Sequence, residues 1–283
     1  SVSLDKRQNV DWFLLYDGLL KNIDNSSVDS KQSNFNLNIS HQFSTSKRNS
    51  FSQINFRQHR QSFYGLPSVI EDNYILSNFD PVQRLTYFSI TSDWKWYDRI
   101  VKGFTLNSYY TADSYSTREN EVSFSSKFQL DFGSINLTTI PKINILSTTF
   151  KEDYYTRLEN DLFSVIGGAS IYLSKEKGLF KFRLGIQSYI ISGDNYAERN
   201  LYYFPDIKIA FKPENSNFIP FLNINGEFNQ NSFRALSHLN PYIAPAIRLR
   251  SSFSPYKIEL GTRSSLTKGW EFQWNVFYSS EEN

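Results

Sequence analysis

The fold is decided by one stretch of the sequence, residues 179–191, which reads LFKFRLGIQSYII. Apolar and polar positions alternate along it, with Phe180, Phe182, Leu184, Ile186 and Ile190 on one parity and Lys181, Arg183, Gly185 and Gln187 on the other. Successive side chains of a β-strand point to opposite faces, so a period of two predicts a strand with one apolar face.

The same alternation recurs along the chain, for example where residues 33–45 set Phe35, Leu37 and Ile39 against asparagines. Convincing amphipathic helices are missing, and turn residues such as Gly133 and Gly178 separate the segments, so the chain is predicted to be all-β. The expected strands are 10–22, 33–45, 50–62, 83–94, 100–112, 121–132, 134–147, 162–174, 179–191, 201–211, 218–230, 245–253, 256–265 and 270–279.

Strand length and connection length both point to a membrane. Each expected strand has about 10–14 residues, against ~5–6 in soluble proteins and ~9–11 for a tilted membrane strand. Tight turns alternate with longer polar connections, as they do between the two rims of an outer-membrane barrel. The fold class predicted is a transmembrane antiparallel up-and-down β-barrel of about 14 strands in the bacterial outer membrane. The alternative is a soluble β-sandwich whose aromatic residues fill a core.

This interpretation divides the chain into three parts. Residues 1–9 are expected to be an N-terminal periplasmic segment, residues 10–279 the barrel and residues 280–283 a C-terminal tail. No stretch of the sequence approaches the ~20 apolar residues of a membrane helix, but a closed barrel satisfies its backbone groups equally well.

Composition excludes several classes of function. The 283 residues hold no cysteine, which removes disulfides, thiolate metal sites and cysteine nucleophiles. A formal charge of +2 gives no reason to expect a nucleic-acid partner. Aromatic residues cluster near strand ends, as at Trp94, Trp96 and Tyr97, where amphipathic rings suit the headgroup level of a bilayer.

Charged residues of the C-terminal strands are expected to face the lumen. Those on the polar parity are Lys181, Arg183, Asp206, Lys208, Glu227, Arg248, Arg250, Lys257, Glu259, Arg263 and Glu271. One interpretation is a wall of mutually neutralising pairs, in which Arg248, Arg250, Glu259 and Glu271 form cross-strand ladders. The other is that surplus Arg and Lys give the lumen a preference for anions.

Catalytic and cofactor motifs are missing from the sequence, and no metal site or cofactor is expected. The three histidines, His41, His59 and His238, lack metal-ligand spacing, and no motif places a base beside a nucleophile. A lipolytic barrel enzyme that uses His59 or His238 is kept as an alternative.

Prolines and loop aromatics suggest two further features. Pro141, Pro205, Pro220 and Pro245 fall within or at the start of expected strands, where strand ends, bulges or breaks, and with them a lateral opening, are anticipated. Aromatic residues in the long loops are candidate contacts for a partner protein; they are Phe63, Tyr64, Tyr154, Tyr155, Tyr196 and Tyr242.

The C-terminal third resembles a known family. The segments Leu201–Ile207, Asn240–Ile243 and Trp270–Tyr278, together with Gly261, are similar to outer-membrane barrels of Bacteroidota, many of which are TonB-dependent-receptor-like. The resemblance covers about the last eighty residues and implies a receptor-like barrel. Fewer than ten residues precede the first expected strand, so a barrel without a plug is expected.

The function expected is therefore non-enzymatic. The barrel is expected to provide a narrow passive passage or a membrane anchor, in contact with lipopolysaccharide and phospholipid. The alternative is an accessory or scaffold subunit of a larger outer-membrane complex for transport, secretion or barrel assembly, bound through its loops and barrel wall.

Overall fold

The computed structural model describes residues 2–5, 7–19, 31–62, 82–151, 160–193, 196–213, 218–241, 243, 249, 251–267 and 270–280. The strands are β1 (Val2–Asp5), β2 (Gln8–Leu19), β3 (Gln32–Ser44), β4 (Arg48–Ser62), β5 (Val82–Trp96), β6 (Val101–Asp113), β7 (Arg118–Phe132), β8 (Ile135–Phe150), β9 (Asn160–Lys177), β10 (Phe180–Gly193), β11 (Tyr196–Phe211), β12 (Phe218–Asn229), β13 (Ser252–Thr267) and β14 (Trp270–Ser279). One helix, α2 (Phe233–Leu239), lies between β12 and β13.

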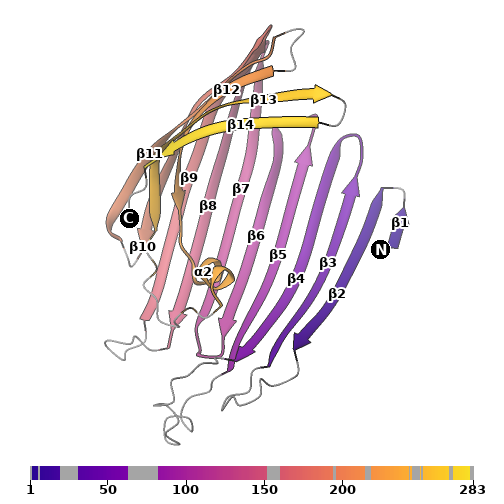
Figure 1. Ribbon diagram of the computed structural model, residues 1–283, viewed down its shortest axis with the longest axis vertical. Coiled ribbons are helices and arrows are strands. Elements are labelled where there is room, and N and C mark those ends of the chain that lie inside the picture. Colours follow the sequence, from indigo (N-terminus) through magenta and orange to yellow (C-terminus); the bar gives the residue numbers. More distant parts are fainter. Residues whose placement is uncertain are drawn as a thin grey trace, which may run out of the picture.

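All of the strands belong to one sheet. It is 14-stranded, and each strand pairs antiparallel with the next in the sequence, so the order runs without a crossover from β1 to β14 (Figure 1). The all-β, up-and-down antiparallel fold predicted from the sequence is confirmed. Within the described residues β1 and β14 are the two edges of the sheet, and no ladder joins them.

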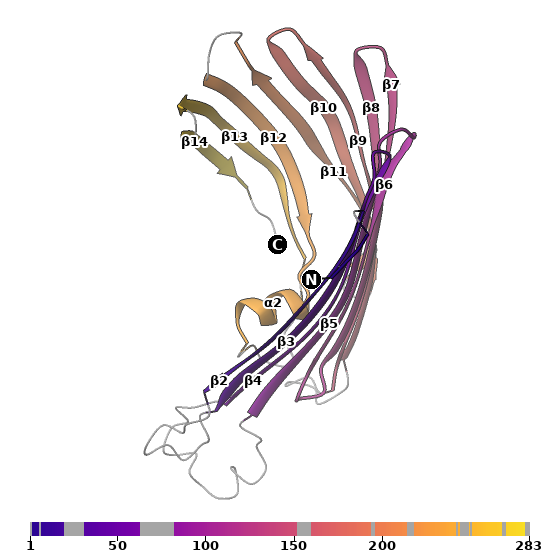
Figure 2. The same ribbon diagram turned by 90° about the vertical axis from the view of Figure 1, so that its right-hand side faces the viewer.

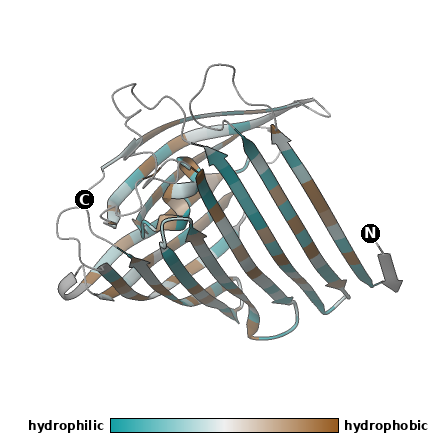
Figure 3. Cartoon of the chain, turned by 90° about the horizontal axis from the view of Figure 1, so that it is seen from below, coloured by the Kyte–Doolittle hydropathy of each residue, from teal (hydrophilic) through white to brown (hydrophobic). Residues whose placement is uncertain are grey.

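The sheet is a single curved layer with α2 on its concave side (Figure 2). Hydrophilic and hydrophobic bands alternate along the strands (Figure 3). On β10 the apolar side chains of Leu184 and Ile186 are 48% and 47% exposed, whereas Tyr189 and Ile191 on the other parity are buried. Such a row of exposed apolar side chains suits contact with lipid, and the opposite parity forms what we call the concave face.

Two differences from the expected strand list cancel in the number of strands, which remains 14. Val2–Asp5 forms β1 within the segment expected to precede the barrel, and one strand, β13, replaces the expected strands 245–253 and 256–265. Pro255 lies between those two expected strands, at a register irregularity between β12 and β13 where Asn225 pairs with Lys257 but Glu227 pairs with Ser254. A bulge accommodates the proline that lacks a ladder donor, so the strand continues.

The prolines differ in their effect on the sheet. Pro141 and Pro220 lie inside continuous strands and pair on one side, but each interrupts or ends the ladder on the other side. The β7–β8 ladder omits Pro141, and the β11–β12 ladder stops at Phe221, next to Pro220. Pro205 does mark a break, because the β11–β12 ladder stops at Asp206, the next residue. Pro245 lies outside the described residues. In the described part of the chain, no helix combines the length and apolar character needed to cross a membrane.

Candidate functional site

Four of the charged residues expected in the lumen come together near the short-turn ends of β10–β13. Lys181 and Arg183 lie on β10, Lys208 on β11 and Arg263 on β13, and all four line a cavity of about 550 Å³. Arg183 and Lys208 are direct cross-strand partners, which places like charges side by side. We call these four residues the basic patch.

Carboxylates neutralise only part of the basic patch. Arg183 forms an ion pair with the buried carboxylate of Asp206, and its guanidinium lies 3.5 Å from the centroid of the Tyr172 ring. Lys181 pairs with Glu176 at 3.1 Å, in a solvent-exposed geometry that contributes little. Lys208 and Arg263 have no ion-pair partner among the described residues, although Arg263 donates a hydrogen bond to Gln273. The cavity therefore carries a positive charge.

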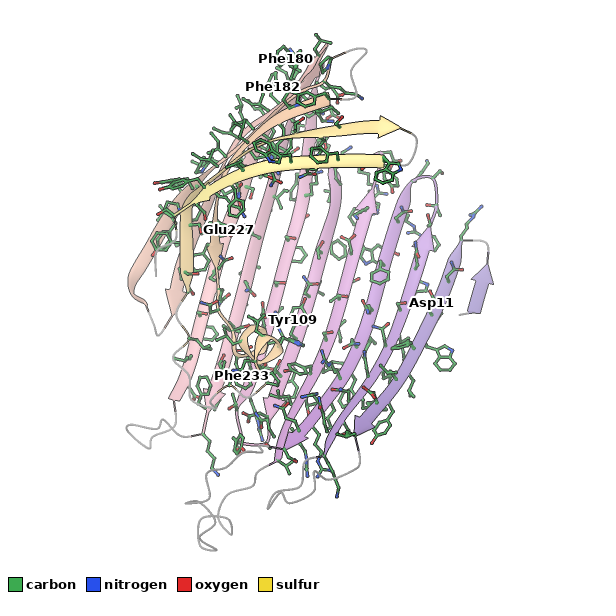
Figure 4. The ribbon with its side chains drawn as sticks, viewed as in Figure 1. Asp11, Tyr109, Phe180, Phe182, Glu227 and Phe233 are labelled. Atoms are coloured by element: carbon green, nitrogen blue, oxygen red, sulfur yellow. The ribbon has the colours of Figure 1, made fainter. Side chains whose placement is uncertain are left out.

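Among the described residues, the remaining expected lumen charges form no cross-strand ion pair with one another. Glu259 accepts hydrogen bonds from the amides of Asn223 and Asn275, each at 2.8 Å, rather than from an arginine. Lys257 lies over the Phe277 ring, and Glu271 on β14 is exposed. Glu227 is exposed just beyond the irregularity in β12 (Figure 4). Arg248 and Arg250 lie outside the described residues.

Helix α2 lies against the concave face of β5–β8, where the sequence predicted only a loop. The missed signal is Ser232, whose hydroxyl oxygen accepts a hydrogen bond from the Ala235 amide and caps the helix. Phe233 and Leu236 then fall on one side of the short helix and pack into the cluster around Leu85 and Phe150. Tyr109 and Phe233 show the place of this contact on the sheet (Figure 4).

A buried carboxylate anchors α2 at its start. Glu119 on β7 is 1% exposed and accepts hydrogen bonds from the backbone amides of Phe233 and Arg234, at 2.7 and 2.8 Å. The Thr148 hydroxyl donates a third, at 2.7 Å. The first backbone N–H groups of a helix have no acceptor within the helix and otherwise donate to water. The Glu119 carboxylate accepts from two of them and so binds α2 to the wall.

Side chains along α2 make further contacts with the wall. Arg234 forms an ion pair with Glu121 at 2.8 Å, and its guanidinium lies 4.0 Å from the centroid of the Tyr109 ring. Tyr87 stacks on His238 with ring centroids 4.2 Å apart and donates a hydrogen bond to Ser237. These contacts hold the helix at both ends, so α2 narrows the space inside the curved sheet.

A second cavity of about 670 Å³ lies beside α2 on the concave face. Polar groups from β7, β8 and the β12–α2 connection line one part of it, and an amide network links them: Asn144 donates to Gln230 at 2.7 Å, and Gln230 donates to Ser164 at 2.7 Å. Tyr189, Phe228 and Ile166 line another part.

The histidines considered for catalysis have structural contacts. Both ring nitrogens of the buried His59 lie within hydrogen-bond distance of side-chain amide oxygens, those of Asn34 and Gln61. Burial, followed by the charges of Arg57 and Arg234, lowers the pKa of His238 below its ordinary value of 6.5. In the described residues no group of three or more His, Cys, Asp or Glu is placed to hold a metal ion.

The loop aromatics expected to contact a partner are not placed. Phe63, Tyr64, Tyr154, Tyr155 and Tyr242 lie outside the described residues. Tyr196 begins β11, but its side chain is not among those described. Their role as partner contacts stays a prediction.

Comparisons with known proteins identify the fold. No protein-family model matches the sequence, and no curated protein matches it. Among solved structures, the FrpB iron transporter of Neisseria meningitidis has a TM-score of 0.66 at 12% identity, over 97% of this chain and 50% of its own. The alcaligin outer-membrane receptor FauA of Bordetella pertussis has a TM-score of 0.60 at 8% identity, over 99% and 47%. The siderophore receptor PirA of Acinetobacter baumannii has a TM-score of 0.60 at 11% identity, over 93% and 46%.

The chain thus has the fold of outer-membrane β-barrel receptors, and it spans about half the length of each. The outer-membrane location expected from the sequence agrees with this fold. The likeness confirms the receptor-like barrel expected from the C-terminal segments. The bacterial group and the absence of a plug stay predictions.

Proposed function

We propose that the chain forms the wall of a non-enzymatic passage for small anions across the bacterial outer membrane, with α2 narrowing that passage. The observation that carries the proposal is the basic patch on the concave face. Lys208 and Arg263 have no carboxylate partner among the described residues, and basic rings of this kind favour anions in pores.

Three other observations support a transport role. The apolar parity of the strands is exposed, as contact with lipid requires, and the concave parity carries the polar groups. Helix α2 partly fills the concave side, so the passage is narrow rather than an open porin-like channel (Figure 2). The solved structures with this fold are described as iron transporters and siderophore receptors rather than as enzymes.

Ion selectivity in a planar bilayer tests this proposal. The double variant Lys208→Gln with Arg263→Gln removes the two cations that lack a carboxylate partner, so the ratio of chloride to potassium permeability should fall toward one. Lys47→Gln with Lys102→Gln is the matched control, because it removes the same charge from the short-turn rim, where Lys47 is 79% exposed. An unchanged reversal potential in the first variant, or no conductance from the native protein, contradicts the proposal.

A second function, as a subunit of a larger outer-membrane complex, is favoured by β14. Every residue of this edge strand is exposed, including Trp270, Phe272 and Trp274, and an unpaired strand edge is a template for further pairing. The mass of the particle extracted in mild detergent separates the two functions. One chain with its detergent belt supports the passage, and a heavier particle with additional chains supports the subunit.

A further inference from the structure

The ladder between β11 and β12 is short, with five pairs among the described residues. Between β11 and β12 the ladder runs only from Asp206 with Asn225 to Ala210 with Phe221. Beyond it, residues 201–205 of β11 pair only with β10, and residues 227–229 of β12 pair only with β13. We call this unpaired stretch the seam.

The sequence itself produces the seam. Pro205 lacks a backbone N–H and cannot donate to a β12 partner. Opposite it, Gly226 lies at the register irregularity, and a Cβ built there meets Phe204 and the carbonyl oxygen of Pro255 within 2.7 Å. A side chain at position 226 is therefore excluded, and β12 passes directly against the Phe204 ring.

Ring contacts replace hydrogen bonds across the seam. Tyr202 on β11 lies 6.2 Å from Phe228 on β12 and 5.2 Å from Phe253 on β13, between ring centroids. Tyr189 on β10 contacts Phe204 and Phe228 at 5.6 and 5.9 Å. Ring pairs are individually weak, whereas a strand ladder in lipid is held by backbone groups that find no water. The seam is thus the weakest join in this part of the wall.

The seam leads to the second cavity, because Tyr189 and Phe228 belong to both. Beside the seam, Lys142 donates a hydrogen bond from its ammonium group to the Tyr189 hydroxyl and lies over the Tyr189 ring, 4.0 Å from the centroid. It has no carboxylate partner among the described residues. Glu121 also lines this cavity, but its carboxylate is paired with Arg234. Apolar rings at the seam, with the Lys142 ammonium beside them, match a molecule with an acyl chain and an acidic head.

We propose that the seam is a lateral portal through which an acyl carboxylate, such as a fatty acid, moves between the second cavity and the bilayer. The aromatic rings move apart to admit the chain, and Lys142 binds the carboxylate. This proposal does not depend on anion conduction along the barrel axis, since its route passes through the wall.

The absence of cysteine makes a reversible block of the seam available. In Tyr202→Cys with Phe228→Cys, two thiols replace rings that contact each other across the seam, with centroids 6.2 Å apart, and oxidation joins the two strands there through a disulfide. The matched control is Ile209→Cys with Leu222→Cys, which joins the same two strands where they already pair.

The probe is 11-(dansylamino)undecanoic acid, carried in phosphatidylcholine vesicles that contain the protein. Native protein should give saturable dansyl fluorescence, and Lys142→Gln should weaken binding by roughly tenfold or more, as loss of a charge-assisted hydrogen bond does. Oxidation of the seam pair should reduce the rate of probe transfer to that of protein-free vesicles, and dithiothreitol should restore the original rate. The control pair should transfer the probe at the native rate in both the oxidised and the reduced state.

Two results overturn the proposal. One is an equal rate of probe transfer by the oxidised and the reduced seam pair. Both states are measured on the same variant, so any effect of the substitutions on stability is common to them. The other is equal binding of dansylamide, which has neither chain nor carboxylate. Conductance is measured in a separate experiment. If the native protein shows no anion selectivity, the proposed passage fails but the transfer and binding results for the seam still stand.

Discussion

At the scale of single residues, Glu119 explains why a polar connection lies against the wall. Its carboxylate is almost fully buried, yet three donors satisfy it, two of them amides of the first turn of α2. A buried carboxylate without donors is strongly unfavourable, so Glu119 and α2 stabilise each other. Removing either partner leaves buried polar groups on the other.

Glu119→Ala should therefore release α2. Loss of a satisfied buried acceptor costs about 1–3 kcal/mol, which corresponds to roughly a tenfold or greater rise in the undocked population. Cleavage by trypsin after Arg234 reports this population, because a protease needs the helix to open. Glu176→Ala, which removes an exposed carboxylate, should leave the cleavage rate unchanged. Equal rates in both variants would mean that Glu119 does not hold the helix.

His238 should make the position of α2 depend on pH. Docking lowers the pKa of His238 through burial and through the nearby charges of Arg57 and Arg234, so the undocked state binds a proton more readily. Docking is then fully favourable above the ordinary pKa of 6.5 and weakens as the pH falls below it. A spin label at Leu239→Cys should gain mobility between about pH 8 and pH 5, and His238→Gln should remove that change. A label whose mobility is the same at all pH values disproves it.

At the scale of the elements, the odd or even position of a residue in its strand determines which face of the sheet its side chain occupies. Two neighbouring positions on β7 test this assignment. Phe124 is 42% exposed on the apolar face, whereas Ser123 accepts a hydrogen bond from Asn107 on the concave face. Lysine in the lipid face of a barrel costs about 2–4 kcal/mol near the bilayer centre. Phe124→Lys should lose that much stability in urea unfolding from phospholipid vesicles, and Ser123→Lys should lose little. Equal losses of stability in the two variants would show that the two faces of the sheet have been assigned wrongly.

Sequence patterns predicted strands well and connections poorly. The alternation along 179–191 places Leu184 and Ile186 on the exposed face because each side chain reports its own parity. Helix α2 was missed because its contacts with Glu119 and Tyr87 come from strands more than one hundred residues away in sequence. The expected division between residues 253 and 256 is a bulge within one strand, because a bulge and a strand end use the same residue types.

Register decided which charges meet, and sequence alone did not provide it. Four of the eleven expected lumen charges form the basic patch, since the β10–β11 register sets Arg183 opposite Lys208. Glu259, expected in an ion-pair ladder, has asparagines beside it on β12 and β14 instead. A shift of two residues along either strand would have given different partners on the same face.

At the scale of the whole molecule, one curved antiparallel sheet presents an apolar face to lipid and a polar, cationic face to its concave side. Its likeness to outer-membrane iron transporters and siderophore receptors rests on architecture, because sequence identity is 12% or lower for the structures described. The interpretation of the passage, of helix α2 and of the seam therefore depends on one assignment, that the sheet has an apolar lipid-facing side and a polar concave side.

Cysteine scanning along residues 180–187 in phospholipid vesicles tests that claim most directly, because the native chain has no cysteine. Fluorophores attached at Leu184→Cys and Ile186→Cys should be quenched by brominated lipid, and cysteines at Lys181 and Gln187 should instead react with a charged, water-soluble maleimide. The two signals should alternate with a period of two residues. Equal quenching and equal reactivity at both parities would contradict it.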